Sequence, residues 1–153
     1  MAKRFAGTHR HKVEERGRVS LPSAFRKVLA SLDTNEVYVL PQLERADAHL
    51  CLTGPGFDAY CAKVEAAIDD PAELKAFTRY FNSRATILEP DDLGRIVLSK
   101  ELREPLGIAK ELVFVGLGFS FEICAPDRQA ADREAAETLA RPVLDRVPMT
   151  GLH

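Results

Sequence analysis

The stretch GRVSLPSAFR, residues 17–26, recurs as GRIVLSKELR at residues 94–103, a constant offset of 77 residues. After a two-residue adjustment, residues 36–40 (EVYVL) align with residues 111–115 (ELVFV). A likeness that persists at nearly constant spacing indicates that one supersecondary unit is repeated. The chain is therefore interpreted as a tandem duplication.

Each copy predicts the same order of local structure. An acidic residue, two variable positions and Gly-Arg predict a tight turn, because glycine adopts the positive φ that other residues resist. A strand of period two follows, in which Val19 and Leu21 face one way and Arg18 and Ser20 the other. A short helix and two apolar strands complete the copy. These further strands are expected at residues 37–40 and 50–52 in the first copy and at 112–115 and 119–124 in the second.

The predicted fold class is α+β. Each copy spans about 40–45 residues, a size at which a lone core rarely suffices, so the copies are expected to pack together about a pseudo-twofold axis. Between them, Pro55 and Pro71 stand where helices begin, and apolar residues recur at helical spacing. Pro142 is expected to end a last helix that begins near residue 126. The predicted division is a first copy 5–54, a helical connector 55–84, a second copy 85–125 and a C-terminal helix 126–145.

Charge is divided unevenly along the 153 residues. The formal net charge is −2, but residues 1–28 contain eight Lys or Arg and two Glu, which is +6 and leaves −8 on the rest. A cationic end on an anionic body attracts phosphate at one face and repels it elsewhere. Charge alone also fits a solvated N-terminus with no partner.

Other function classes lack their sequence signatures. The four histidines lie apart from any nucleophile motif, and no phosphate loop, dinucleotide fingerprint or zinc-protease helix is present, so we expect no enzyme, cofactor, metal or small-molecule substrate. Cys51, Cys61 and Cys124 lack the spacing of a zinc site or disulfide framework and are expected to be buried small hydrophobes. No apolar run approaches about 18 residues, and the first residues lack the apolar core of a secretory signal. We therefore expect no membrane contact and a cytoplasmic location.

The repeated turn resembles a motif of a known family. Residues 14–18 (EERGR) and 91–95 (DDLGR) resemble the paired Asp-x-x-x-Arg motifs of the bacterial MraZ proteins. Residues 79–85 (RYFNSRA) resemble the Arg-Phe-Phe segment before the second motif, and residues 5–11 (FAGTHRH) match the usual N-terminus. The resemblance covers roughly residues 5–140.

This resemblance implies both a fold and a function. MraZ proteins are two-copy members of the AbrB-like swapped-hairpin group, which implies a pseudo-twofold double β-barrel with short helices. The implied function is a sequence-specific DNA-binding transcriptional regulator that binds short promoter repeats upstream of the division and cell-wall gene cluster. The implied assembly is a homo-oligomeric ring, associated with the nucleoid, which presents many motif copies to double-stranded DNA.

Two departures from the family pattern affect the motif region. Carried over position by position, the motif residues are Glu14 and Arg18 in the first copy and Asp91 and Arg95 in the second. Because Glu14 stands where the family has Asp, its turn or its contact with the arginine is expected to differ. Ser99 stands where proline is usual, and an extra Pro105 is expected to distort the second short helix.

Arg18 is the residue expected to carry most of the DNA contact. It follows a glycine turn on a rigid strand, and its planar fork can contact a guanine edge or a phosphate through two hydrogen bonds. Arg95 has acidic neighbours, so the second copy is expected to serve mainly the architecture. The acids Glu14 and Asp91 either orient the arginines or close the turns, and a structural salt bridge is the alternative for each arginine. The expected phosphate contacts are Lys3, Arg4, Arg10, Lys12 and Arg16.

Two other functions fit the same fold. AbrB-like hairpins also occur in antitoxins, although two folded copies with a short C-terminal tail disfavour that layout. A purely structural oligomeric scaffold is the other alternative. Residues 112–121 contain more apolar side chains than one face of a small barrel requires, which favours contact between subunits.

Overall fold

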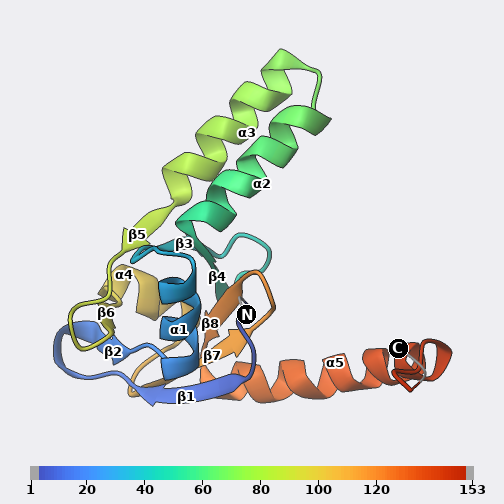
Figure 1. Cartoon of the computed structure of the whole chain (residues 1–153). Helices are drawn as coiled ribbons and strands as arrows, with labels where there is room; N and C mark the ends of the chain where they lie inside the picture. Colours follow the sequence, from blue (N-terminus) through green and yellow to red (C-terminus); the bar gives the residue numbers. More distant parts are fainter. Residues whose placement is uncertain (1–3, 151–153) are drawn as a thin grey trace.

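The strands of the two sequence copies are interleaved. A computed structural model describes residues 4–150 and has the predicted mixed α+β fold (Figure 1). Its strands are β1 (Thr8–Lys12), β2 (Arg18–Ser20), β3 (Val37–Pro41), β4 (Ala48–Thr53), β5 (Thr86–Leu88), β6 (Arg95–Val97), β7 (Glu111–Gly116) and β8 (Phe121–Cys124). Six strands form one antiparallel sheet in the order β1-β7-β8-β4-β3-β5, and β2 pairs only with β6.

Helices and two 3-10 turns join these strands within residues 4–150. The α-helices are α1 (Ser23–Ser31), α2 (Gly54–Ala67), α3 (Pro71–Arg84), α4 (Lys100–Arg103) and α5 (Pro126–Arg146). The 3-10 turns are η1 (Glu15–Gly17) and η2 (Glu104–Leu106). The strands and helices predicted for each copy occur in the predicted order, and β1 and β5, which precede the two turns, are additional to that pattern.

The sheet has the internal symmetry that the repeat suggests. The part of the chain before α2 is called the first half here, and the part after α3 the second half. β1 of the first half pairs with β7 of the second, and β5 of the second half pairs with β3 of the first. Arg10 lies opposite Val113, and the residues related to them by offsets of 77 and 75, Ile87 and Tyr38, also lie opposite each other. Each half thus contributes its first strand to the hairpin of the other.

The expected closed β-barrel is not formed. Within the described residues, the large sheet ends at β1 on one side and at β5 on the other, with no hydrogen-bonded pairing between these two edges. The short strands β2 and β6 hydrogen-bond to each other instead of bridging the edges. The pair therefore stands as a separate ribbon beside an open sheet.

One hydrophobic core is shared by both halves. Val19 and Ile96, at the centres of β2 and β6, are completely buried. Phe25 of α1 packs against Phe5 and Phe121, with ring centroids 5.0 and 4.8 Å apart. Because the cluster draws side chains from both ends of the chain, neither half buries its apolar surface alone.

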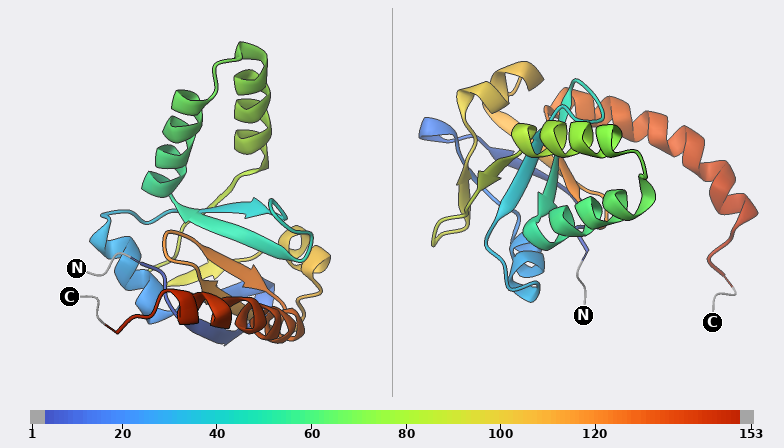
Figure 2. Two further views of the ribbon diagram at one scale, coloured as in Figure 1. Left: turned by 90° about the vertical axis from the view of Figure 1, so that its right-hand side faces the viewer. Right: turned by 90° about the horizontal axis from the view of Figure 1, so that it is seen from above.

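Helices α2 and α3 form a hairpin that projects from the sheet (Figures 1 and 2). The side chains of Thr53 and Asp70 cap their first turns by accepting hydrogen bonds from backbone amides, and each helix has a proline in its first turn. Phe57 stacks on Phe81 with ring centroids 4.7 Å apart. The two helices predicted from residues 55–84 are confirmed.

Pro105 interrupts the second short helix as expected. α1 has nine residues, whereas α4 has four and continues as the 3-10 turn η2. The early end leaves the Leu102 carbonyl without a helical partner. His49 Nε2 donates to that carbonyl at 2.6 Å, and its Nδ1 accepts from the Gln42 amide at 3.2 Å.

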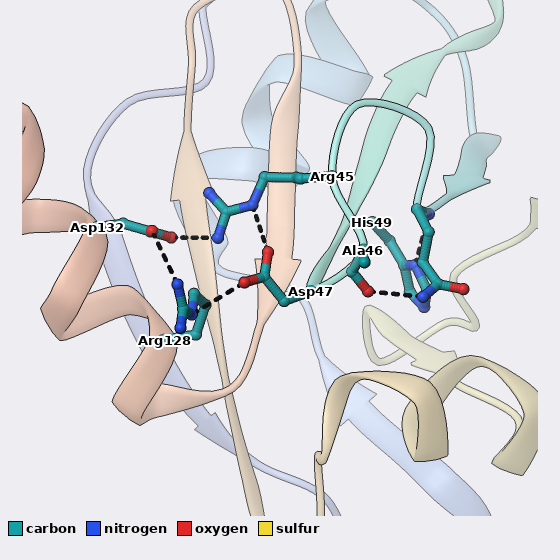
Figure 3. A network of polar contacts seen from close by, with 7 residues as sticks. Arg45, Ala46, Asp47, His49, Arg128 and Asp132 are labelled. Atoms are coloured by element: carbon teal, nitrogen blue, oxygen red, sulfur yellow. Dashed lines mark hydrogen bonds and ion pairs between the residues drawn. The ribbon is translucent and has the colours of Figure 1, made fainter.

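α5 extends away from the sheet, and none of its residues is buried (Figure 2). Its first turns are held by an ion-pair network in which Arg45 bridges Asp47 and Asp132 at 2.6 Å each, and Arg128 reaches Asp47 at 3.0 Å (Figure 3). The hydrogen bond from Arg45 lowers the pKa of the Asp47 carboxyl. Within residues 4–150, no helix is both long enough and apolar enough to cross a membrane.

The expectation that Pro142 ends this helix is wrong. α5 continues through Pro142 to Arg146. Proline removes one helical hydrogen bond and crowds the preceding turn. The part of α5 around Pro142 is exposed, so water can bind the freed carbonyl and the axis can bend. The interruption therefore does not end the helix.

His49 predicts a loss of stability in acid. Burial lowers its pKa from the ordinary value of about 6.5, so below that pH the unfolded chain binds a proton more readily than the folded chain. The free energy of unfolding should therefore fall as the pH drops below about 6.5. Urea unfolding of the wild type and His49→Gln at about pH 7.5 and about pH 5.5 measures this. Burial also lowers the pKa of His11, but His11 is present in the wild type and in His49→Gln alike. If the two proteins lose the same free energy of unfolding between these pH values, His49 is not the cause.

Candidate nucleic-acid interface

The β2–β6 ribbon has one buried face and one open face. Val19 lies opposite Ile96, and both point into the core. Side chains alternate across a strand, so their neighbours point outward and are half-buried or exposed. The open face consists of Arg18, Ser20, Arg95 and Val97.

The antiparallel register brings the two motif arginines onto this face. Arg18 lies opposite Val97, and Arg95 lies opposite Ser20. The arginines are therefore diagonal neighbours, with a spacing of about 7–8 Å. The ribbon lies on the side of the molecule away from the free end of α5 (Figure 1). Arg18 is half-buried, so its guanidinium is not enclosed in the core.

The turns before the two strands have the same backbone hydrogen bonds. The amide of Glu14 donates to the Arg18 carbonyl at 2.8 Å, and the Gly17 amide donates to the Glu14 carbonyl at 3.1 Å. In the second copy the equivalent bonds, between Asp91 and Arg95 and between Gly94 and Asp91, are both 2.9 Å. The repeated motif is thus a repeated turn geometry.

Both turns need glycine at the position before the arginine. Gly17 and Gly94 each have φ of +76°, where other residues are strained. A Cβ atom on Gly17 would collide with the carbonyl oxygen of Leu98, and one on Gly94 would collide with the Arg26 side chain. Glycine at this position is therefore required by conformation and by space.

The second turn holds its arginine through the acid. Asp91 Oδ1 accepts hydrogen bonds from the amides of Leu93 and Arg95, and its Oδ2 accepts from Arg95 Nε, all at 2.9 Å. Hydrogen bonds from the backbone and side chain of Arg95, with that from Leu93, lower the pKa of the Asp91 carboxyl. Asp91 thus both closes the turn and orients the arginine.

The first turn is built differently, as the substitution of Glu for Asp leads one to expect. Within residues 4–150, Glu14 and Arg18 form no ion pair with each other, and Glu14 makes no side-chain cap. Arg16 takes a left-handed conformation, with φ of +63°, where the second turn has Leu93. The longer carboxylate leaves Arg18 unpaired, so the structural salt bridge considered for Arg18 is absent among the described residues.

The other basic candidates differ in availability, and Lys3 lies outside the residues that the structure describes. Arg4 is exposed. Lys12 on β1 and Arg16 in the first turn are exposed. Arg10 is also exposed, but its Nε and Nη2 donate to the two carboxylate oxygens of Glu111 at 3.1 and 2.9 Å. That pair lowers the pKa of Glu111. Arg10 of β1 is therefore already paired with a residue of β7. This pairing depends on how the two strands are aligned in the sheet, which the sequence does not show.

The expectation of buried cysteines holds for two of the three. Cys51 and Cys124 are buried and Cys61 is half-buried, and burial raises the pKa of Cys124 to about 11. Over residues 4–150, no group of three or more His, Cys, Asp or Glu side chains is arranged to hold a metal ion.

Comparisons with known proteins place the chain in a family. Residues 81–131 match the family model described as "MraZ protein, putative antitoxin-like". The "Transcriptional regulator MraZ" of Ruegeria pomeroyi is 32% identical over 155 residues, covering 97% of this chain and 91% of that protein. The chain belongs to the MraZ family. The MraZ regulators of Rhodospirillum rubrum and Desulforamulus reducens are 35% and 34% identical, over 86% and 92% of this chain and 85% and 98% of their own lengths.

The turn glycine of this MraZ protein gives a stability prediction. Gly107 is left-handed like Gly17, with φ of +67°, but has no atom within 4 Å of an added Cβ. Gly107→Ala should therefore cost only the conformational strain of about 1–2 kcal/mol. Gly17→Ala should cost about 1–3 kcal/mol more, because the Leu98 carbonyl must move. Urea unfolding of both variants tests this, and equal losses would show that the contact with Leu98 relaxes freely.

Proposed function

We propose that this protein is a sequence-specific DNA-binding transcriptional regulator and that the open face of the β2–β6 ribbon reads the DNA. The main support for this proposal is that both motif arginines lie on the open face of the ribbon. Arg18 has no ion-pair partner among the described residues, and Asp91 orients Arg95. The name of the relatives, transcriptional regulator, supports this class of function.

The ribbon has a shape suited to the proposed contact. The major groove of B-DNA is about 12 Å wide and admits a two-stranded β-ribbon. Arginine can donate two hydrogen bonds to guanine O6 and N7, which gives about 1–3 kcal/mol of discrimination. A short ribbon braced on one side by a dry core would present these donors with little freedom.

The two arginines are proposed to have unequal roles. Arg18 has no carboxylate partner among the described residues, so DNA competes with water alone for its guanidinium. Arg95 keeps its Nε on Asp91, and that carboxylate repels approaching phosphate. We therefore assign most of the base contact to Arg18, and to Arg95 a supporting contact through its terminal nitrogens.

Neighbouring cations are proposed to bind the DNA backbone. Lys12 and Arg16 are exposed close in sequence to Arg18, within the segment of formal charge +6. Arg10 would have to exchange Glu111 for a phosphate, so we assign it a smaller contribution. Such contacts add affinity and salt dependence without reading sequence.

The strand exchange supports a double AbrB-like swapped-hairpin fold as part of this proposal. In it, copies 5–54 and 85–125 are joined by the connector 55–84 and followed by the helix 126–145. We further propose that the regulator acts in the cytoplasm, at the nucleoid, on short repeats upstream of the division and cell-wall genes, as the likeness to the family implies.

Two separate apolar surfaces support a ring of subunits. Leu117 and Phe119, between β7 and β8, are 49% and 75% exposed. Phe119 borders a groove of about 370 Å³ lined also by Leu43, Leu52 and Tyr60. The far part of α5 and the residue after it expose a second stripe at Leu139, Val143 and Val147. Different surfaces on one chain form head-to-tail contacts, which close into rings when the rotation permits.

Arg18 and Arg95 provide the decisive pair of variants for DNA binding. Arg18→Ala should abolish the preference for the DNA upstream of the protein's own gene over a scrambled fragment. Each arginine–guanine contact that is lost should remove about 1–3 kcal/mol of the free energy that discriminates the two fragments. Arg95→Ala should reduce the preference less, because Arg95 is shared with Asp91. Gel shifts at several salt concentrations, with circular dichroism to verify folding, measure both. Undiminished preference in Arg18→Ala would remove this residue from the reading role and favour a scaffold or antitoxin.

The proposed ring predicts a high native mass. Light scattering at micromolar concentration should give several times the mass of one chain, and Phe119→Ser should lower it because an apolar contact is lost. Leu93→Ser, which changes another exposed apolar residue, is the control and should keep the mass. A monomeric wild type would contradict the ring while leaving DNA binding by the ribbon to be measured separately.

A further inference from the structure

Each turn glycine is covered by an arginine from the other half of the chain. Arg103, on α4 of the second half, lies against Gly17 of the first turn, with its Nε 3.3 Å from the place of a Cβ. Arg26, on α1 of the first half, lies against Gly94 of the second turn, with Nη1 and Nε 2.6 and 2.9 Å from that place. Arg26 and Arg103 are separated by the same 77 residues as the two motifs. The contact is therefore a repeated feature of the duplicated unit.

Arg103 is linked to the first turn through the backbone of Leu98. Its Nε donates to the carbonyl of Leu98 at 2.9 Å, and that carbonyl lies directly against Gly17. The Leu98 amide in turn donates to the Gly17 carbonyl at 2.8 Å. Leu98 itself is completely buried, so the linked groups have little room to shift.

These hydrogen bonds connect Arg103 to the backbone of Arg18, the residue proposed to contact the DNA bases. The Gly17 carbonyl belongs to the peptide that begins Arg18. The Leu98 carbonyl and amide belong to the peptide groups on either side of this residue, so holding the Leu98 backbone in place also holds the direction of the Gly17 carbonyl and hence the start of β2. The second turn has a carboxylate to orient its arginine, but Glu14 makes no such contact in the first turn within residues 4–150. The first turn therefore depends more on support from outside itself.

We propose that Arg103 is a positioning residue for Arg18: it holds the first turn in its DNA-reading geometry through the Leu98 carbonyl. This role rests on the proposed function of the ribbon. Arg103 is half-buried, and its effect on DNA passes through the turn, not through direct contact with bases. Arg26 supports the second turn by packing on Gly94.

Two uncharged substitutions separate the hydrogen bond from the charge. Arg103→Gln places an amide nitrogen at the position of Arg Nε and keeps a donor for the Leu98 carbonyl. Arg103→Met has a similar length but places a methyl group there. Both remove one positive charge, so a difference between them reports the hydrogen bond.

The variants are compared by operator preference, salt dependence and turn protection. Arg103→Met should lower the ratio of operator to scrambled-DNA affinity roughly tenfold, and Arg103→Gln should keep it within about twofold of the wild type. The salt slope should stay unchanged in both, since no phosphate contact is lost. Hydrogen exchange of the free protein should quicken at the amides of Gly17 and Leu98 in Arg103→Met only.

Three outcomes would overturn the role of Arg103. Equal loss in both variants with a salt slope lower by about one indicates a direct phosphate contact. An equal fall in operator and scrambled-DNA affinity, with amide exchange quickened throughout the protein and not at the turn alone, indicates general destabilisation. Unchanged preference in both variants indicates no role. If the wild type shows no operator preference, the proposed function fails, and the exchange data alone then decide whether Arg103 holds the turn.

Discussion

The pairing of β2 with β6 is the interaction on which the rest of the structure depends. It places Val19 and Ile96 opposite each other on the ribbon face that packs into the core, which neither half completes alone. It also turns the opposite face outward, with one motif arginine from each half. Because side chains alternate along a strand, the register that buries one face of the ribbon also exposes the other. A shift of one residue in this register would bury the arginines and expose the core.

The internal duplication has diverged at the site more than in the scaffold. The backbone hydrogen bonds of the two turns agree closely, and the strand registers are related by the repeat offsets. The side chains differ: the shorter Asp91 reaches both the turn amides and Arg95, whereas Glu14 makes no equivalent contacts among the described residues. One methylene group therefore distinguishes an arginine held by its own turn from one that is free to bind a ligand. We suggest that a symmetric fold gains two unequal contacts in this way.

The sequence predicts the elements well but not the contacts that join them. Repeat spacing and apolar periodicity correctly locate the strands that follow each turn and the two helices between the copies, but not β1 and β5. The departure from the family pattern at Pro105 correctly predicts the interrupted second short helix. The open sheet, the continuation of α5 through Pro142 and the pairing of Arg10 with Glu111 were not foreseen, because each depends on neighbours or solvent exposure that local patterns do not encode. The same is true of Arg103: the repeat shows that it matches Arg26, but only the folded chain shows that each lies on the glycine of the opposite turn. The nucleotide-contacting roles of the motif residues are still predictions.

The proposed function requires that DNA meets the open face of the ribbon. Photochemical cross-linking of the 153-residue protein to the fragment upstream of its gene, followed by mass spectrometry of the peptides, tests this directly. Cross-links are expected within residues 10–20, centred on Arg18, with weaker ones within residues 91–97. Cross-links confined to the α2–α3 hairpin or to α5, with none on the ribbon, would contradict it.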